Sequence, residues 1–170
     1  MDHKSDILFR STVSSLLECY RTRFPGSYIY PATVSHEVYW GHFSIVSAEL
    51  SCIRDLLTNG KDWRYALDMA GSEVMLATNL ELVTKIRQND GKKFASSFPM
   101  PEDFKRARVT VKRDFQDPAG LRELGPQGPP PHNISLYAGG KSWVLPRQFL
   151  TFLTLHPVAK DFLGKNISTE

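Results

Sequence analysis

Three polar residues, Asp68, Ser72 and Glu73, follow a short apolar run near the middle of the chain. The run Tyr65–Leu67 is typical of a buried strand, and a helical pattern of apolar residues begins after Thr78. In open α/β sheets, a turn between a strand and a helix lies at the carboxyl end of the strand, where ligands bind. We therefore expect these side chains to point into a cleft, although a solvated turn without chemistry fits the same spacing.

Carboxylates are the main candidates for acid–base chemistry, although each is more often a solvated surface acid than a base. The candidates are Asp68, Glu73, Glu102, Asp103, Asp161 and Glu170. No serine lies in the Gly-x-Ser-x-Gly pattern of a nucleophile elbow. The segment Gly139–Ser142 is similar to the end of a phosphate-binding loop, but the upstream glycine is missing and a strand pattern follows. A close-packed turn that lines a cleft is the better interpretation of this segment.

The sequence contains no pattern typical of a metal site. Its five histidines are scattered, without pairs at the spacing of metal ligands on a helix. It also lacks Asp-x-Asp, the pair with which many sugar-nucleotide transferases hold Mn²⁺ or Mg²⁺ against a diphosphate. We therefore expect no metal cofactor, and a sugar-nucleotide enzyme of this kind would neutralise the diphosphate with Lys and Arg.

The composition is that of one globular domain, with 170 residues, 41% of them hydrophobic, and a formal charge of +3 spread along the chain. No basic run predicts a nucleic-acid partner, no apolar stretch approaches the roughly 18 residues of a membrane span, and the polar start has no signal-peptide pattern. Cys19 and Cys52 lie in helical apolar patterns, which predict buried free thiols. Two Asn-x-Ser sequons make Asn133 and Asn166 candidate glycosylation sites.

Helical and strand patterns alternate along the chain and would position these residues. We predict a helix at 6–20 with Ser5 as its N-cap, and further helices at 41–57, 78–89, 146–155 and 158–163. We predict strands at 27–30, 65–67, 94–98, 108–112 and 142–145. This alternation is typical of an α/β domain with a largely parallel sheet and right-handed crossovers. The Pro/Gly-rich stretch from Asp117 to His132 is predicted to be an extended surface loop.

Four sequence blocks, in the same order, resemble the core-2/I-branching β-1,6-N-acetylglucosaminyltransferases, glycosyltransferase family 14. The central block contains Asp62-Trp63-Arg64-Tyr65, Gly71-Ser72-Glu73 and Thr78-Asn79-Leu80-Glu81. The other three are Asp2-His3-Lys4, Val38–Gly41 with Ala48–Cys52, and Leu136–Trp143. The resemblance covers nearly the whole chain, and its specificity comes from the order and spacing of the four blocks together.

The resemblance implies an α/β domain of the GT-A-like, Rossmann-related type, incomplete at both ends. Residues 1–91 would form the nucleotide-sugar-binding part and residues 92–170 the acceptor-side part. The implied reaction is metal-independent, inverting transfer of GlcNAc from UDP-GlcNAc to a glycan or glycoprotein hydroxyl in O-glycan biosynthesis. A xylosyltransferase-like enzyme that uses UDP-xylose stays an alternative. The implied location is the lumenal side of the Golgi membrane, reached through an anchor outside this sequence.

The family's donor-binding positions correspond to Asp2, Tyr39, Ser72 and Glu73, with Glu73 in place of the usual Asp. Its acceptor-binding region corresponds to a group of basic and small residues: Lys105, Arg106, Gly139, Gly140 and Lys141.

Two further expectations come from the resemblance. The family's catalytic Glu is expected just beyond Glu170, so this chain would be a fragment without the catalytic base. The family carries half-disulfides at the positions of Cys19 and Cys52 with partners upstream, so these two cysteines are not expected to bond to each other. A non-catalytic UDP-sugar- or glycan-binding remnant and a chain that does not fold stably are the alternatives to an enzyme.

Overall fold

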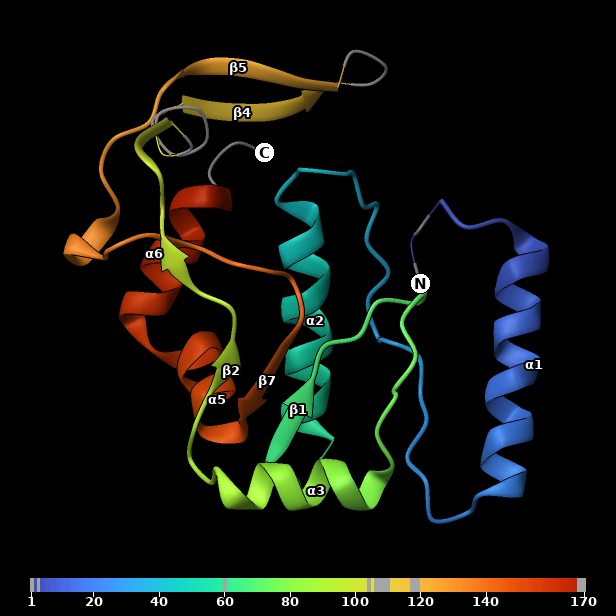
Figure 1. The fold of residues 1–170 in the computed structure, drawn as a ribbon. Helices are drawn as coiled ribbons and strands as arrows, with labels where there is room; N and C mark the ends of the chain where they lie inside the picture. Colours follow the sequence, from blue (N-terminus) through green and yellow to red (C-terminus); the bar gives the residue numbers. More distant parts are fainter. Residues whose placement is uncertain are drawn as a thin grey trace. The chain divides into compact units, whose positions relative to one another are not determined.

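The computed structural model describes residues 2, 4–59, 61–103, 105, 111–116 and 120–167. The chain forms two compact units (Figure 1). The first unit holds the described residues of 1–60 and 113–123, and the second holds those of 61–112 and 124–167.

In the first unit, α1 (Ile7–Arg23) confirms the first predicted helix and extends it by about one turn. Its N-cap is Asp6 rather than Ser5, because the Asp6 carboxylate accepts the N–H of Phe9 at 2.7 Å. No residue of α1 is buried, so the predicted apolar stripe of Phe9, Val13, Leu16, Leu17 and Tyr20 is at most half-buried among the described residues.

The segment 27–30 is not a strand, and this prediction was wrong. The Arg21 side chain donates to the backbone oxygen of Ile29 at 2.9 Å, so a guanidinium occupies a carbonyl that a neighbouring strand would otherwise use.

Helix α2 (Ser44–Thr58) confirms the second predicted helix, with Leu50 and Ile53 buried. It begins three residues later than predicted, because Gly41 has a positive φ of 78° and the His42 N–H closes a turn onto the oxygen of Tyr39.

Both cysteines are free and exposed, so the prediction of buried thiols was wrong. Cys19 lies on α1, which buries none of its residues. Cys52 is exposed although Ser51 and Ile53 are buried, because each helical residue is turned by about 100° from the one before it.

The second unit is built on a three-stranded sheet in the order β1 (Tyr65–Leu67), β7 (Trp143–Pro146), β2 (Phe94–Ala95). Ala66 pairs with Leu145, and Phe94 with Val144. Both pairings are antiparallel, as is the pairing of β3 (Phe98–Pro99) with β6 (Tyr137–Ala138).

The largely parallel sheet was therefore a wrong prediction for these strands. β1 and β2 do run in the same direction, as a strand–helix–strand unit requires, since each is antiparallel to β7. However, β7 from the far end of the chain lies between them and takes up the hydrogen bonds of both.

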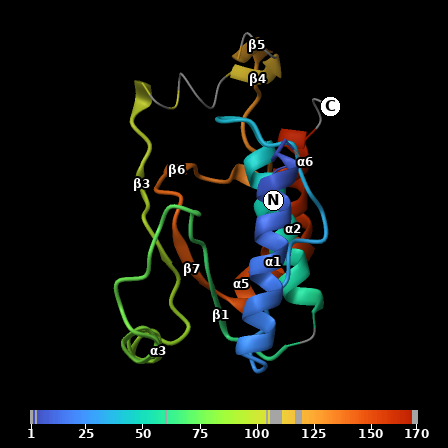
Figure 2. The same ribbon diagram turned by 90° about the vertical axis from the view of Figure 1, so that its right-hand side faces the viewer.

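Helix α3 (Asn79–Gln88) connects β1 to β2 and begins with a complete capping box. The Thr78 hydroxyl accepts the N–H of Glu81, and the Glu81 carboxylate accepts the N–H of Thr78. The Thr78 N–H, and then the Thr78 hydroxyl, which also donates to the Glu81 carboxylate, lower the pKa of Glu81. Figure 2 shows α3 end-on, on the other side of β7 from α5 (Arg147–Leu155).

Helices α5 and α6 (Pro157–Ile167) cover the sheet and provide most of the core of this unit. Leu150 of α5 is fully buried, and Leu145 of β7 and Ala159 of α6 are buried with it. Pro146, predicted as the first helical residue, ends β7 and is the N-cap of α5.

The predicted loop from Asp117 to His132 contains a strand. β5 (Gly120–Pro126) pairs with β4 (Val111–Gln116), which includes the end of the strand predicted at 108–112. The prolines of this stretch lie at or beyond the ends of β5, so its other residues keep the N–H groups that strand pairing needs. A 3₁₀ turn, η1 (Pro131–Asn133), follows.

Candidate functional site

A small cluster of Asp2, Lys4, Val38 and Tyr39, which we call the Asp2 cluster, forms in the first unit. Asp2 Oδ1 accepts the backbone N–H of Lys4 at 2.9 Å and that of Val38 at 3.5 Å. The Lys4 ammonium donates to the oxygen of Val38 at 2.6 Å and lies 3.8 Å from the centre of the Tyr39 ring. The structure thus brings together two predicted donor-binding residues that are far apart in sequence.

The electrostatics of the Asp2 cluster keep its carboxylate charged. The Lys4 N–H lowers the pKa of Asp2 most strongly, and the Val38 N–H and the Lys4 ammonium, 4.0 Å away, lower it further, against an opposing effect of burial. An ionised carboxylate beside an aromatic ring can accept hydrogen bonds from sugar hydroxyls or a base N–H while the ring stacks on a planar ligand.

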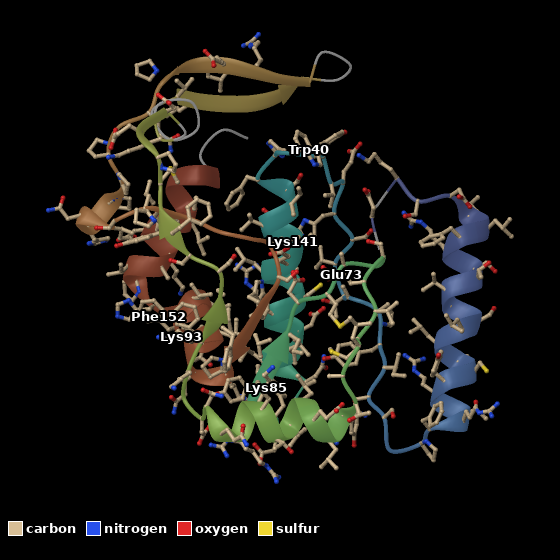
Figure 3. The ribbon with its side chains drawn as sticks, in the orientation of Figure 1. Trp40, Glu73, Lys85, Lys93, Lys141 and Phe152 are labelled. Carbon is tan, nitrogen blue, oxygen red and sulfur yellow. The ribbon has the colours of Figure 1, made fainter. Side chains whose placement is uncertain are left out.

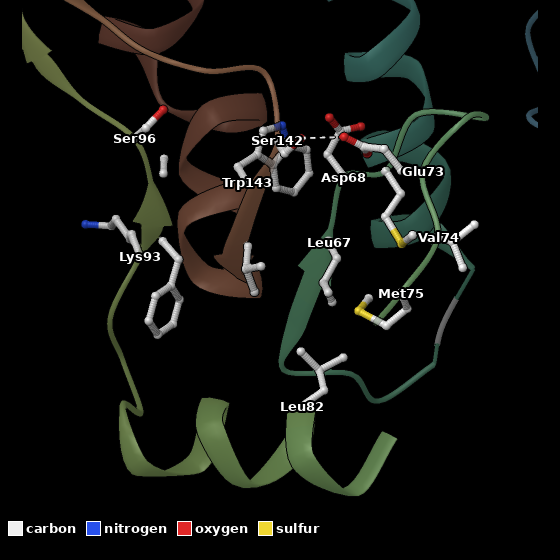
Figure 4. A pocket seen from close by; sticks show the side chains of 14 residues that line it. Leu67, Asp68, Glu73, Val74, Met75, Leu82, Lys93, Ser96, Ser142 and Trp143 are labelled. Carbon is white, nitrogen blue, oxygen red and sulfur yellow. Dashed lines mark hydrogen bonds between the residues drawn. The ribbon is translucent and has the colours of Figure 1, made fainter. Parts of the chain in front are cut away.

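The second unit contains a cavity of about 810 Å³, which we call the sheet cavity. It lies among β1, β2, β7, α3 and the turn after β1 (Figure 4). This volume is in the range of ligand pockets, and its lining is mainly apolar, with Trp143, Phe94 and Leu82 among the residues. The polar lining consists of Asp68, Glu73, Lys93, Ser96 and Ser142.

Glu73 closes the turn after β1 and ties it to β7. Its own N–H donates to the oxygen of Ala70 at 2.9 Å, and its carboxylate accepts the Ala70 N–H at 2.6 Å. The other carboxylate oxygen accepts the Ser142 hydroxyl at 3.1 Å. Figure 3 labels Glu73 together with Lys141, the residue that precedes Ser142 in the chain.

Asp68 is anchored through its backbone, whose N–H donates to the oxygen of Trp143 at 2.9 Å. Its side chain is 14% exposed, and its Oδ2 lies 3.9 Å from the Lys141 ammonium without a hydrogen bond among the described residues. The prediction that Asp68 and Glu73 point into a cleft is confirmed. Ser72 is exposed and is not among the residues that line the sheet cavity.

The two glycines before Lys141 form the close-packed turn that the sequence predicts. A Cβ atom on Gly139 would lie 2.1 Å from the backbone oxygen of Ser96, and one on Gly140 would lie 2.8 Å from Ser96 Oγ. The Gly140 N–H donates to Ser96 Oγ at 2.5 Å. Glycine is therefore required here by a close approach of two chain segments, one of which lines the sheet cavity.

The remaining candidates lie elsewhere. Lys105 lines a second cavity of about 400 Å³ with Tyr137, and its ammonium lies 3.4 Å from the Glu102 carboxylate. Arg106 lies outside the described residues. Asn133 is exposed in η1, and Asn166 falls within α6.

Sequence reasoning assigned no role to two contributors to these sites. Lys4 connects Asp2 to Tyr39, and its signal in the sequence is its place in the Asp2-His3-Lys4 block that resembles the family. Trp143 lines the sheet cavity and ends the Leu136–Trp143 block, although an aromatic residue in a strand is usually a core residue.

The described residues contain no group of three or more His, Cys, Asp or Glu side chains able to hold a metal ion. Over the same part of the chain, no helix has the length and apolar character that crossing a membrane requires.

The mixed helix and strand architecture is compatible with an α/β glycosyltransferase domain. The sequence profile described as Core-2/I-Branching enzyme matches residues 1–158. The chain belongs to this family.

Curated relatives match nearly the whole chain. A β-1,3-galactosyl-O-glycosyl-glycoprotein β-1,6-N-acetylglucosaminyltransferase 4 of Danio rerio is 30% identical over 99% of this chain and 39% of its own length. An N-acetyllactosaminide β-1,6-N-acetylglucosaminyl-transferase of Mus musculus is 30% identical over 96% of this chain and 40% of its own length. The chain thus spans about two fifths of the length of these relatives.

Proposed function

We propose that this chain is part of a glycosyltransferase that transfers GlcNAc from UDP-GlcNAc to a hydroxyl of a glycan or glycoprotein. Family membership and the names of the relatives support the acetylglucosaminyltransferase type. The observation that carries the donor site is the Asp2 cluster, in which a charged carboxylate lies beside the Tyr39 ring. A GT-A-like architecture and a Golgi lumenal setting are part of the same proposal and rest on the family resemblance.

In the proposed reaction, an acceptor hydroxyl oxygen attacks the anomeric carbon of GlcNAc while the bond from that carbon to UDP breaks. The configuration inverts, a carboxylate base takes the hydroxyl proton, and UDP leaves with its charge neutralised by basic side chains rather than by a metal. None of the residues assigned in this chain has the role of the base. The assigned residues bind and orient the two substrates.

We assign the donor to Asp2 and Tyr39 of the first unit. Ser72 and Glu73 of the second unit are proposed as donor-binding residues only through their match to the family's turn. Asp2 would accept hydrogen bonds from the uridine part. We assign the acceptor to five basic and small residues: Lys105, Arg106, Gly139, Gly140 and Lys141. Among these, the segment 139–141 has the clearest structural support, because Lys141 lies near Asp68 and Gly140 bonds to Ser96.

Calorimetric titration of the 170-residue chain with UDP tests the donor site. Loss of a hydrogen bond to a charged group costs about 1.5–3 kcal/mol, so we expect Asp2→Ala to weaken UDP binding roughly 10- to 150-fold. Tyr39→Ala should weaken it as well, and Asp62→Ala, which removes an exposed carboxylate, serves as the control. UDP binding that tolerates both Asp2→Ala and Tyr39→Ala would refute the donor site.

Two additions to this titration separate the alternatives. Addition of EDTA should leave UDP affinity unchanged if binding is metal-independent. Competition between UDP-GlcNAc and UDP-xylose should favour UDP-GlcNAc, and the opposite order would favour the xylosyltransferase-like alternative.

Binding without catalysis is a separate outcome. UDP release from UDP-GlcNAc in the presence of a β-1,3-galactosyl acceptor measures turnover directly. Binding of UDP with no release would favour the non-catalytic remnant for this chain. Release by the chain alone would show that the base lies among its own residues.

A further inference from the structure

A stripe of three polar residues, Ser44, Ser51 and Asp55, lies on one face of α2, and we call it the polar stripe. Because each helical residue advances the direction of its side chain by about 100°, these positions fall within about 40° of one another. Ser51 and Asp55 are each only 8% exposed. Buried polar groups on a helix that also buries Leu50 and Ile53 require specific partners.

Each of the three residues has a partner in one segment, residues 33–39, which we call the strap. Asp55 accepts the N–H of Thr33 at 2.8 Å and the Thr33 hydroxyl at 2.6 Å, one on each carboxylate oxygen. At the other end of the strap, Ser44 Oγ accepts the N–H of Tyr39 at 3.0 Å. The strap therefore runs antiparallel to α2, from Asp55 back to the first turn of the helix.

The middle contact joins Ser51 Oγ to His36 Nε2 at 2.8 Å. The Ser51 hydroxyl also donates to the backbone oxygen of Ser47 at 3.0 Å, which uses its only proton. In the tautomer that carries its proton on Nε2, His36 donates to Ser51 Oγ. Every third residue of the strap thus donates to one residue of the polar stripe: Thr33 to Asp55, His36 to Ser51 and Tyr39 to Ser44.

The same strap forms one side of the Asp2 cluster. Its Val38 N–H donates to Asp2, its Val38 oxygen accepts from Lys4, and the Lys4 ammonium lies over the Tyr39 ring. The strap belongs to no strand among the described residues, and these side-chain contacts hold it against α2 and Asp2. A shift of the strap along α2 would move Tyr39 relative to Asp2.

We propose that Ser51 and Asp55 are positioning residues for the donor site, because they hold the strap so that Tyr39 and Val38 stand beside Asp2. This inference rests on the proposed function only in assigning Asp2 and Tyr39 to the donor. The two residues do not contact the donor themselves. They act through Thr33 and His36 on the strap, which contains Tyr39, a residue assigned to the donor.

UDP titration of the 170-residue chain tests this role, at a temperature at which thermal melts show every variant folded. Asp55→Asn removes the charge that holds two donors, and we expect at least a tenfold loss of UDP affinity. Ser51→Ala removes the one neutral hydrogen bond that Ser51 makes to the strap, together with its bond to the Ser47 oxygen, and should weaken UDP binding roughly fivefold. Ser47→Ala, on the same helix outside the polar stripe, and Asp62→Asn are the matched controls and should bind UDP normally.

A double-substitution cycle distinguishes positioning from general destabilisation. If Asp55 acts through the strap, Asp55→Asn should cause little further loss of affinity in a Tyr39→Ala background. If it acts by destabilising the fold, the loss should be the same in both backgrounds. Thr33→Val removes the strap hydroxyl while keeping its shape, and provides the same test should Asp55→Asn fail to fold.

Three outcomes would overturn the inference. The first is UDP affinity in Asp55→Asn and Ser51→Ala equal to that in Ser47→Ala. The second is a loss that persists undiminished in the Tyr39→Ala background. The third is absence of UDP binding by the unsubstituted chain, which overturns the donor site itself and is recognised before any substitution is made.

Discussion

The contact between Gly139 and Ser96 provides the sharpest prediction about stability. A Cβ atom at Gly139 would lie 2.1 Å from the Ser96 backbone oxygen, whereas real Cβ contacts essentially never fall below 3.0 Å. The two segments would have to separate by about 1 Å, and neither atom belongs to a side chain that could rotate away. Overpacking of this kind costs about 1–3 kcal/mol, and a backbone clash belongs at the upper end of that range.

We therefore expect Gly139→Ala to destabilise the chain by about 3 kcal/mol, which corresponds to a fall in melting temperature of roughly 6–12 °C at this chain length. Thermal and urea unfolding followed by circular dichroism measure this directly. Gly71→Ala is the matched control, because nothing lies within 4 Å of the added Cβ atom. Its stability should stay within about 1 kcal/mol of that of the unsubstituted chain.

Ser96 provides a second control. At Gly140 the added Cβ atom would meet Ser96 Oγ at 2.8 Å, which is a side-chain atom. Ser96→Ala should therefore relieve much of the effect of Gly140→Ala and none of the effect of Gly139→Ala. A melting temperature for Gly139→Ala equal to that of Gly71→Ala, or rescue of Gly139→Ala by Ser96→Ala, would refute the reasoning.

Two further predictions concern charge and modification. The Thr33 hydroxyl lowers the pKa of Asp55 most strongly, and the Thr33 N–H lowers it further. The ionised Asp55 carboxylate therefore stabilises the fold above about pH 4. This stabilisation is lost as the pH falls through the lowered pKa of Asp55 in the folded state. The difference in unfolding free energy between the unsubstituted chain and Asp55→Asn should thus be largest at pH 7 and should shrink as the pH falls below about 4. A difference that stays constant with pH would contradict this. When the chain is expressed behind an added secretory leader, endoglycosidase-sensitive mass should be lost in Asn133→Gln and largely kept in Asn166→Gln. Asn133 is exposed in a 3₁₀ turn, whereas Asn166 lies within α6.

Most of the helices could be predicted because their signals are local. The apolar spacing on α2 and the Thr78–Glu81 capping box are determined by neighbours within four residues. The strand β1 was predicted with its observed bounds because turn residues follow it directly. Local sequence patterns also predicted that Asp68 and Glu73 lie at a cleft and that Gly139 and Gly140 form a tight turn.

Errors arose where the outcome depends on a partner that the segment's own residue pattern does not reveal. Segment 27–30 has strand-forming residues, but Arg21 takes the oxygen of Ile29. Residues 120–126 look like part of a loop, but β4 is available as a partner. The polar stripe was also missed, because Ser51 and Asp55 look like ordinary surface residues until the strap covers them.

By itself, the sequence determined most of the helices, the polar turn after β1, the close-packed glycine turn and, through four ordered blocks, the family. Only the tertiary structure decided that β7 lies between β1 and β2, that Lys4 joins Asp2 to Tyr39, and that α2 holds the strap. The physical reason is one of range. Helix periodicity and capping depend on residues within a few positions, whereas strand pairing and buried polar contacts depend on which distant donors and acceptors the folded chain brings together.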